Sequence, residues 1–277
     1  MKVIGILPFK NEEYFLPTFL SNVKPVCDEI IAIDDNSTDN SRKIMEDAGV
    51  IVKGYDDGLV AKEGLLAHGR GEAFDYLVGE KTSKTAKVAI KAAAAKLLSA
   101  QNPVISVNGN VAALCPKDVV QLAKATKANI EVNLFYYDEA RKKKIEKSLK
   151  KAGAKQVLGT NPRSYRKIGG LDSPRRIVDK NGIFVADVVL VPLEDGDRTE
   201  ALQKMGKTVI TFDLNPLSRT ARKADITIVD NVIRGMKLLV SACKKSKSAK
   251  TNFNNRRALS SAVSEIKDNL RKRGSLA

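Results

Sequence analysis

Polar side chains gather immediately after three apolar runs in the second half of the chain. Each run has the length of a buried strand and ends abruptly in acidic, amide or hydroxyl residues. The clusters comprise Glu194, Asp195, Asp197 and Arg198 after the first run, Asp213, Leu214, Asn215, Ser218, Arg219 and Thr220 after the second, and Asp230 and Asn231 after the third. Because open α/β folds bind ligands at the carboxyl ends of parallel strands, these clusters predict a common site for a nucleotide or a similar small ligand.

The cluster after the second run is the most specific of the three. An acidic residue at the end of a strand, such as Asp213, often binds ribose hydroxyl groups. Ser218, Arg219 and Thr220 carry hydroxyl and guanidinium donors that suit phosphate oxygens. The Asp-Asn pair after the third run repeats the arrangement, and several such ends in a row favour a nucleotide site.

Three carboxylates stand within four residues after the first run, at Glu194, Asp195 and Asp197. Such a group could hold Mg²⁺ near a triphosphate. The simpler alternative is that Asp197 caps the helix that follows, which requires only one acidic residue.

Two further segments have residue types that suit ligand binding. Residues 68–72 (HGRGE) resemble a compact phosphate-binding loop, in which glycines free the backbone N–H groups and Arg70 supplies a planar cation. The alternative is a surface turn before a helix that begins near Glu72. Asn108 and Asn110 follow an apolar run at 103–107 and suit a hydroxyl or carboxylate ligand, although a plain turn would use the same residues.

The motifs that are missing exclude several classes of protein. The chain has no complete Walker A motif and no complete G-x-G-x-x-G motif, so neither standard phosphate loop is expected. His68 is the only histidine, and no His/Cys cluster has zinc spacing. The G-x-S-x-G motif of α/β-hydrolases is also absent.

Acidic residues at 34–39 could face a metal or a nucleotide, or could cap a helix.

Strand-like and helix-like segments alternate along the chain. The expected strands include residues 103–107, 130–135, 186–191, 208–214 and 224–230, and the most regular helix covers 84–99. This alternation predicts an α/β fold, a Rossmann-like doubly wound parallel sheet with helices on both faces. We divide the chain into a β-α-β-α-β unit at 1–55, whose third strand is expected at 50–52, a main domain at 56–247 and a basic tail at 248–277.

The net charge of the 277-residue chain is +16. Half of it lies between Lys244 and Ala277, where ten basic residues stand against two acidic ones and Phe253 is the only aromatic residue. We expect a solvated, partly disordered basic extension there, or a segment attracted non-specifically to polyanions. Nucleic acid is not the expected partner, because nucleic-acid proteins usually interleave aromatic residues with the basic ones.

The chain has the features of a protein of the reducing cytoplasm. Its three cysteines, Cys27, Cys115 and Cys243, are far apart, which argues against a disulfide framework. No apolar stretch approaches the roughly 18 residues of a membrane span, so no membrane association is expected. The N-terminus has no signal-peptide pattern and instead predicts a first strand.

From residue 57 to residue 245 the chain closely resembles the archaeal-type 4-phosphopantoate–β-alanine ligases, also called phosphopantothenate synthetases. The matching segments are GLVAKEGLLAHGRGEAFDYLVGEKT, PVISVNGNVAAL, IEVNLFY, ADVVLVPLEDGDRTEAL and DLNPLSRTARKADITIVDN. The resemblance implies an ATP- and Mg²⁺-using ligase of coenzyme A biosynthesis, usually a homodimer. It implies nucleotide contacts at Arg70, residues 213–215, residues 218–220, Asp230 and Asn231.

The resemblance also suggests a reaction. 4-Phosphopantoate would be activated by ATP, as an acyl-adenylate, and the amine of β-alanine would then attack to give 4-phosphopantothenate and AMP. We expect Glu72, Asn108, Asn110 and Asp197 to contact the acid substrate, the amine or the metal. Such catalysis works mainly through positioning and charge stabilisation, without a covalent nucleophile.

The first 50 residues depart from that family. They lack its Ser-His-Pro-Arg segment, and Ala48 aligns with an arginine that helps to bind ATP. The segments ILPFKNEEYFLPTFL and DEIIAIDDNSTDNS instead resemble the start of a family 2 glycosyltransferase, whose residues at Asp34 and Asp35 would contact a nucleotide-sugar. The later metal-binding motif and the acceptor-binding half of such enzymes do not follow.

Four hypotheses are therefore open. The leading one is the ligase. A second keeps the fold and nucleotide binding but loses most of the turnover, because the N-terminal arginine is missing. The third is a nucleotide-sugar-dependent glycosyltransferase, and the fourth is nucleic-acid binding through the basic tail.

Overall fold

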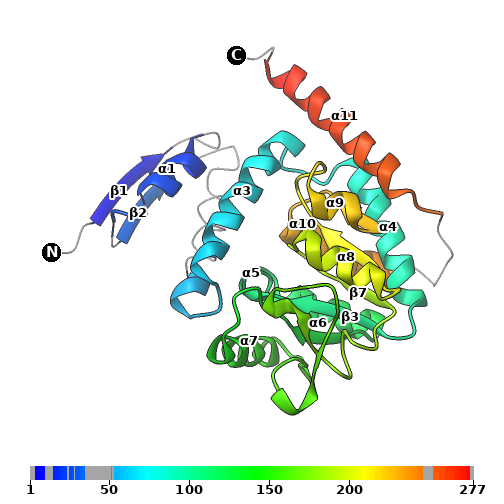
Figure 1. Cartoon of the computed structure of the whole chain (residues 1–277). Helices are drawn as coiled ribbons and strands as arrows, with labels where there is room; N and C mark the ends of the chain where they lie inside the picture. Colours follow the sequence, from blue (N-terminus) through cyan, green and yellow to red (C-terminus); the bar gives the residue numbers. More distant parts are fainter. Residues whose placement is uncertain are drawn as a thin grey trace.

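The structure is a computed structural model that describes residues 4–9, 15–23, 25–27, 29–34, 51, 53–245 and 252–274. Its central element is a five-stranded sheet in the order β4-β3-β7-β8-β9, in which every neighbouring pair is parallel. The strands are β3 (Pro103–Val107), β4 (Asn129–Val132), β7 (Val188–Leu190), β8 (Thr208–Phe212) and β9 (Ile226–Ile228). The predicted parallel α/β sheet is confirmed (Figure 1).

Helices cover both faces of this sheet, as the apolar runs predicted. Ile105 and Ile210 face one apolar cluster, with α4 (Lys84–Ser99), α6 (Pro116–Thr126) and α10 (Val232–Lys245). Val189 and Val209 point to the opposite face, where they pack with Leu202 of α8 (Gly196–Lys204). Successive strand residues alternate between the two clusters, so the strands are apolar on both sides.

The strand order places a topological switch between β3 and β7. The chain passes from β3 to β4 on one side, then returns across to β7 on the other side of β3. The connection from β4 contains α7 (Glu139–Lys151) and an antiparallel pair, β5 (Tyr165–Lys167) and β6 (Ile177–Asp179). Open α/β sheets bind ligands in the crevice at such a point.

Three helices that start at this edge of the sheet are each capped by a side chain at the N-terminus. Asn108 caps α5 (Gly109–Leu114), Asp195 caps α8, and Ser218 caps α9 (Arg219–Lys223), each accepting a backbone N–H three residues ahead. These residue types are preferred at the first position of a helix because they satisfy otherwise unpaired N–H groups. The cap of α8 is therefore Asp195, and not Asp197 as the alternative to a metal-binding role had it.

Helix α3 (Lys62–Val78) corrects the prediction of a phosphate loop at residues 68–72. The segment lies in the middle of a continuous helix, and the helix begins ten residues before Glu72. Each glycine in a helix costs up to about 1 kcal/mol relative to alanine, which is why the sequence favoured a loop. Tertiary contacts along α3 outweigh that cost.

Strand β4 is shorter than the strand expected at 130–135. It ends at Val132, because the Asn133 side chain donates to the carbonyl oxygens of Arg175 at 3.2 Å and Ile177 at 2.9 Å. Phe135 and Tyr136 therefore leave the sheet and become available to the cavity described below.

The N-terminal residues that the structure describes form a small parallel pair, β1 (Ile4–Phe9) and β2 (Glu29–Asp34), with α1 (Leu16–Val23) between them in the chain. Figure 1 shows this unit beside α3. Ile51 is helical, so the strand expected at 50–52 is wrong at that residue. A short apolar run does not distinguish a strand from a buried helical turn. Residues 35–50, with Asp35 and Ala48, lie outside the described residues.

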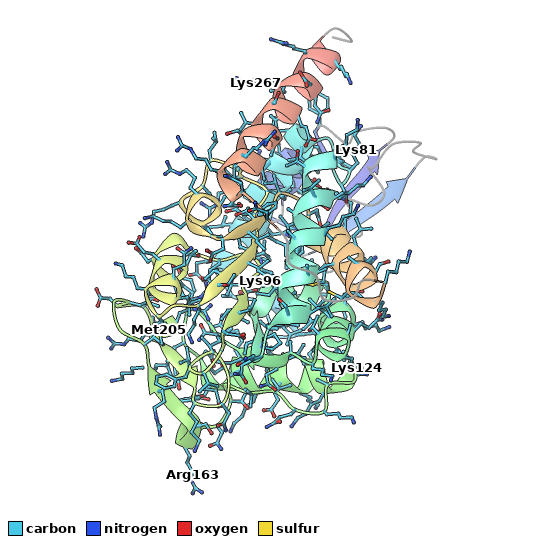
Figure 2. The ribbon with its side chains drawn as sticks, turned by 90° about the vertical axis from the view of Figure 1, so that its right-hand side faces the viewer. Lys81, Lys96, Lys124, Arg163, Met205 and Lys267 are labelled. Atoms are coloured by element: carbon cyan, nitrogen blue, oxygen red, sulfur yellow. The ribbon has the colours of Figure 1, made fainter. Side chains whose placement is uncertain are left out.

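The C-terminal segment is more ordered than the basic extension that we expected. Residues Asn255–Gly274 form a twenty-residue helix, α11, that packs against α3, α4 and α9 (Figure 2). Asn255 anchors its start, because its side chain accepts from Thr227 N at 2.8 Å and donates to the carbonyl oxygens of Ala221 and Ala224. Across the described residues, no helix is both long enough and apolar enough to span a membrane.

Candidate active site

A cavity of about 330 Å³ opens at the carboxyl edge of the sheet, at the switch between β3 and β7. Helix α3 forms one wall, and the segments that follow β3, β4, β7, β8 and β9 contribute the others. Its charged and amide lining residues are Glu63, His68, Arg70, Asn108, Asn110, Arg141, Arg175, Glu194, Asp195, Asp230 and Asn231. Each of the three sequence clusters therefore contributes to one cavity, the second of them only through Leu214.

Asn108 joins the two sides of the switch point. Its amide nitrogen donates to the carbonyl oxygens of Pro192 at 3.1 Å and Leu193 at 3.2 Å, at the end of β7. Its amide oxygen accepts the Val111 N–H at 3.0 Å and so caps α5. Both ends of the side chain are engaged, so Asn108 sets the shape of the cavity floor.

Asn110 connects the same floor to α3. It is 8 % exposed, and its amide nitrogen donates to the Gly64 carbonyl oxygen at 2.8 Å. This contact holds the first turn of α3 over the end of β3.

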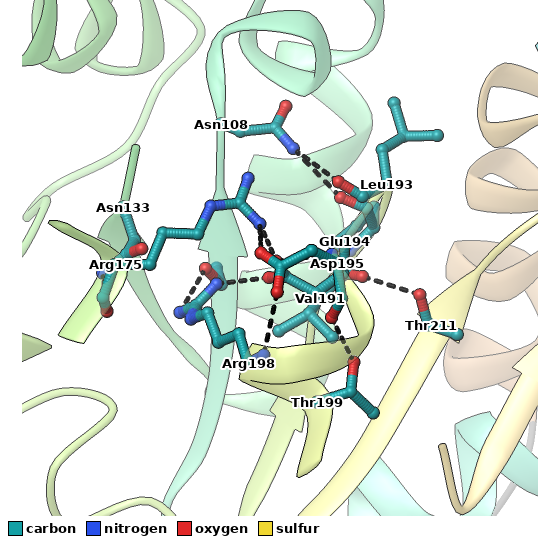
Figure 3. A network of polar contacts seen from close by, with 12 residues as sticks. Asn108, Asn133, Arg175, Val191, Leu193, Glu194, Asp195, Arg198, Thr199 and Thr211 are labelled. Atoms are coloured by element: carbon teal, nitrogen blue, oxygen red, sulfur yellow. Dashed lines mark hydrogen bonds and ion pairs between the residues drawn. The ribbon is translucent and has the colours of Figure 1, made fainter. Parts of the chain in front are cut away.

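Two arginines and one glutamate form a buried ionic cluster behind the cavity. The Glu194 carboxylate contacts the guanidinium groups of both Arg175 and Arg198, as the dashed lines in Figure 3 show. Arg175 also contacts Asp195 at 3.2 Å, and Arg198 donates to Ser106 Oγ at 3.1 Å. Arg175 is 6 % exposed and lines the cavity, whereas Arg198 is 1 % exposed and lies beneath it.

Burial sets the electrostatics of this cluster. Burial, together with the nearby charge of Arg198, lowers the pKa of Arg175 to about 9, while Asp195 opposes the shift. Burial also lowers the pKa of Arg198 to about 10, against the opposing charges of Glu131 and Asp195. Both guanidinium groups remain charged at neutral pH, so Arg175 presents a cation to the cavity.

The acidic cluster after β7 does not form a metal site. Glu194 is bound by two arginines, Asp195 caps α8, and the Asp197 side chain is 70 % exposed and paired with Arg219. Among the residues that the structure describes, no group of three or more potential metal ligands comes together. The Glu194 and Asp195 carboxylates both contact Arg175, whereas the Asp197 carboxylate contacts Arg219 instead.

The turn after β8 is held together by its own side chains. The Asp213 carboxylate accepts the Asn215 N–H at 2.9 Å and the Ser218 hydroxyl, and burial raises the pKa of Asp213 while these bonds oppose the rise. Leu214 lines the cavity, and a Cβ on Gly71 of α3 would lie 3.7 Å from its Cδ1 atom. The turn therefore flanks the cavity next to α3.

Helices α8 and α9 meet beside this turn. Arg219 pairs with Asp197 and is 52 % exposed, whereas the buried Thr220 donates its hydroxyl to the Glu194 carbonyl oxygen at 3.0 Å. A Cβ on Gly196 would lie 2.7 Å from Arg219 Nε, so a larger residue there would displace the Arg219 side chain. Arg219 and Thr220 lie outside the cavity lining.

The comparison with known proteins agrees with this geometry. Residues 85–269 match the family described as phosphopantothenate/pantothenate synthetase. A curated 4-phosphopantoate–β-alanine ligase of Thermococcus kodakarensis is 52 % identical over 229 residues, which are 79 % of this chain and 87 % of the relative. A ligase of the same name from Methanosarcina mazei is 50 % identical over 229 residues, 80 % of this chain and 89 % of the relative. The chain belongs to the phosphopantothenate/pantothenate synthetase family. Residues 6–59 match the glycosyl transferase family 2 model.

Both resemblances seen in the sequence are thereby confirmed. The synthetase match continues to residue 269 and so includes most of α11, beyond the point at residue 245 where the sequence segments stopped. Helix α11 is thus part of the synthetase-like region.

Six of the thirteen predicted site residues line the cavity of this family member: Arg70, Asn108, Asn110, Leu214, Asp230 and Asn231. Asp197, Asp213, Asn215, Ser218, Arg219 and Thr220 lie in the adjoining α8, α9 and β8 segments and do not line it. Glu72 lies in α3, and its side chain is outside the described part of the chain.

Sequence reasoning missed several residues of this site. Arg175 lies in residues 161–181, where nothing in the sequence indicates that the chain returns to the switch point. Asp75 and Arg234 have helical spacing that predicts only a solvated face.

Proposed function

We propose that this protein is an ATP-dependent ligase that joins 4-phosphopantoate to β-alanine and forms 4-phosphopantothenate. The main support is that the segments corresponding to the family resemblance, which follow different strands, line one cavity at the switch point. The curated relatives that share about half of its residues are named for this reaction.

The lining of the cavity fits two anionic substrates and an amine. Arg70 at the mouth and Arg175 in the wall provide cations for phosphate or carboxylate groups. Asn231 and Asp230 provide polar groups at the end of β9, next to α3. In this proposal the pantoate carboxylate displaces pyrophosphate from ATP to form an acyl-adenylate, and the amine of β-alanine then displaces AMP to form the amide bond.

The residues of the turn after β8 would hold the nucleotide. In this proposal Asp213 and Asn215 bind the ribose or the base, and Ser218, Arg219 and Thr220, at the start of α9, bind the phosphates. Mg²⁺ would arrive with the ATP phosphates, since Mg²⁺ is often bound through substrate phosphates rather than by a protein cage.

The remaining residues have narrower roles in this proposal. Asn108 and Asn110 shape the floor on which the acid substrate lies, and Glu72 and Asp197 are assigned to the amine or to the metal-bound phosphates. We also propose that the protein acts as a homodimer in the cytoplasm, and that residues 1–55 form an added unit before a ligase domain at 56–247.

The test is product formation by purified protein with ATP, 4-phosphopantoate and β-alanine. AMP and 4-phosphopantothenate should appear in equal amounts, and neither should appear when β-alanine is omitted. A folded sample that binds ATP and yields no AMP would overturn the ligase proposal and favour a nucleotide-binding protein without turnover.

The match of residues 6–59 supports one alternative, a nucleotide-sugar-dependent transferase. It predicts that a uridine diphosphate sugar binds more tightly than ATP in parallel calorimetric titrations. Tighter ATP binding would contradict it.

A further inference from the structure

Helix α3 carries Arg70 and one wall of the cavity, yet it has almost no apolar face. Among its described side chains only Asp75 and Val78 are buried, at 3 % and 4 % exposure. A helix that packs against a protein body usually does so through an apolar stripe. The position of α3 must therefore depend on specific polar contacts.

The strongest of these contacts joins α3 to α10. Arg234 Nη1 donates to Asp75 Oδ2 at 2.8 Å, and Arg234 Nη2 donates to Asp75 Oδ1 at 2.6 Å, which is a bidentate pair. Such planar pairs fix orientation as well as distance. Asp75 and Arg234 are 159 residues apart in the sequence.

The same guanidinium group also holds the end of β9. Arg234 Nη2 donates to Asp230 Oδ1 at 2.8 Å, and Thr82, just after α3, donates its hydroxyl to Asp230 Oδ2 at 2.7 Å. The Asn231 side chain donates to Asp75 Oδ2 at 3.4 Å. One arginine thus connects α3, the segment after α3 and the Asp-Asn pair predicted to bind nucleotide.

The electrostatics agree with a permanent contact. Burial by itself would lower the pKa of Arg234, but the hydrogen bonds and charges of Asp75 and Asp230 outweigh burial and raise it. The arginine is therefore charged at every physiological pH. Both carboxylate oxygens of Asp230 accept hydrogen bonds from other residues of the protein. We therefore expect Asp230 to affect a ligand mainly through the residues that it positions.

We propose that Arg234 is a positioning residue for the nucleotide side of the cavity, because it fixes the place of α3 relative to the end of β9. Arg70 precedes Asp75 by five residues, or about 7–8 Å along the helix axis. A shift at Asp75 therefore moves Arg70 at the cavity mouth. This inference rests on the proposed function, because it assigns ATP to that side of the cavity.

The test compares steady-state kinetics and ATP titration for the wild type, Arg234→Met, Arg234→Lys and Asp75→Asn. Lys237→Met is the matched control, because Lys237 is exposed on the same helix one turn later. We expect Arg234→Met and Asp75→Asn to raise KM and Kd for ATP about tenfold, with KM for β-alanine within about twofold. Arg234→Lys keeps the positive charge and should raise KM and Kd for ATP by a smaller factor.

The double variant should be no worse than either single variant, since both remove the same contact. A purely structural role would lower the active fraction, and thus the apparent kcat, while leaving KM for ATP unchanged. That outcome in Arg234→Lys and Asp75→Asn would overturn the inference. If Arg234→Met does not fold, Arg234→Lys and Asp75→Asn still test the inference.

The experiments distinguish a failure of the proposed ligase function from a failure of the inference about Arg234. A wild type that binds ATP but forms no product defeats the ligase proposal, while the ratio of ATP Kd values still tests Arg234. A wild type that does not bind ATP defeats both.

Discussion

The Asn108 amide nitrogen lies 3.2 Å from the Leu193 carbonyl oxygen and so links the ends of two strands that are 85 residues apart in the chain. The link crosses the point at which the sheet reverses its winding direction. A ligand crevice at that point needs a defined width, and this hydrogen bond sets it. The same side chain also starts α5, so cavity shape and helix initiation depend on one residue.

We expect Asn108→Ala to lower the free energy of unfolding by about 1–2 kcal/mol, because it removes a helix cap and leaves the Pro192 and Leu193 carbonyl groups unpaired. Chemical denaturation measures this. Asn129→Ala is the control, since the Asn129 side chain is exposed and makes a single long contact at 3.4 Å. Equal stability of the two variants would contradict the linking role.

The second prediction concerns the ionic cluster. Glu194→Gln removes the charge that two buried arginines share, and an uncompensated buried charge costs about 3–5 kcal/mol. We expect a loss of this size in denaturant unfolding. Glu200→Gln should leave the stability nearly unchanged, because Glu200 forms surface pairs with Lys204 and Lys223. A Glu194→Gln protein as stable as the wild type would refute this account.

The third prediction is a pH dependence from Glu131. Burial raises its pKa from 4.5 to about 7, although the Asp179 and Ile183 N–H groups oppose the rise. The folded state therefore favours the protonated acid. The stability that Glu131 contributes is fully present below about pH 4.5 and is lost as the pH rises through about 7.

Glu131→Gln removes this titration. The stability of the wild type relative to Glu131→Gln should therefore fall between pH 5 and pH 8, and the difference isolates Glu131 from other titrating groups. Urea unfolding at several pH values provides the measurement. A difference that stays constant across that range would show that Glu131 does not titrate there.

The fourth prediction separates binding from stability at Arg219. The Arg219–Asp197 pair is exposed, and exposed pairs contribute about 0–1 kcal/mol. Arg219→Ala should therefore leave the melting temperature nearly unchanged. If Arg219 turns onto the ATP phosphates, the same variant should bind ATP about tenfold more weakly, the loss expected for one charge-assisted contact.

Calorimetric titration of ATP measures this effect. Lys223→Ala is the matched control, because Lys223 is a similarly exposed cation on the same helix and contacts Glu200. Unchanged ATP affinity in Arg219→Ala would remove Arg219 from the proposed nucleotide site.

The sequence by itself determined the class of fold and the approximate places of its central strands. Apolar runs such as 103–107 and 208–212 are buried on both sides, and the residues after them cap helices or enter the cavity. These features are local, since a strand end or a cap depends on residues within four positions. Asn231, which follows the last strand and lines the cavity, was found for that reason.

Only the tertiary structure decided which distant groups meet. The glycines around Arg70 favoured a loop, but contacts from Asn110 and Arg234 hold that segment in a helix. Arg175 reaches the cavity from the β5–β6 pair, and α11 packs on the body through Asn255. Periodicity and propensity report the preferences of neighbouring residues, whereas the partner of a buried charge is chosen by how the whole chain packs.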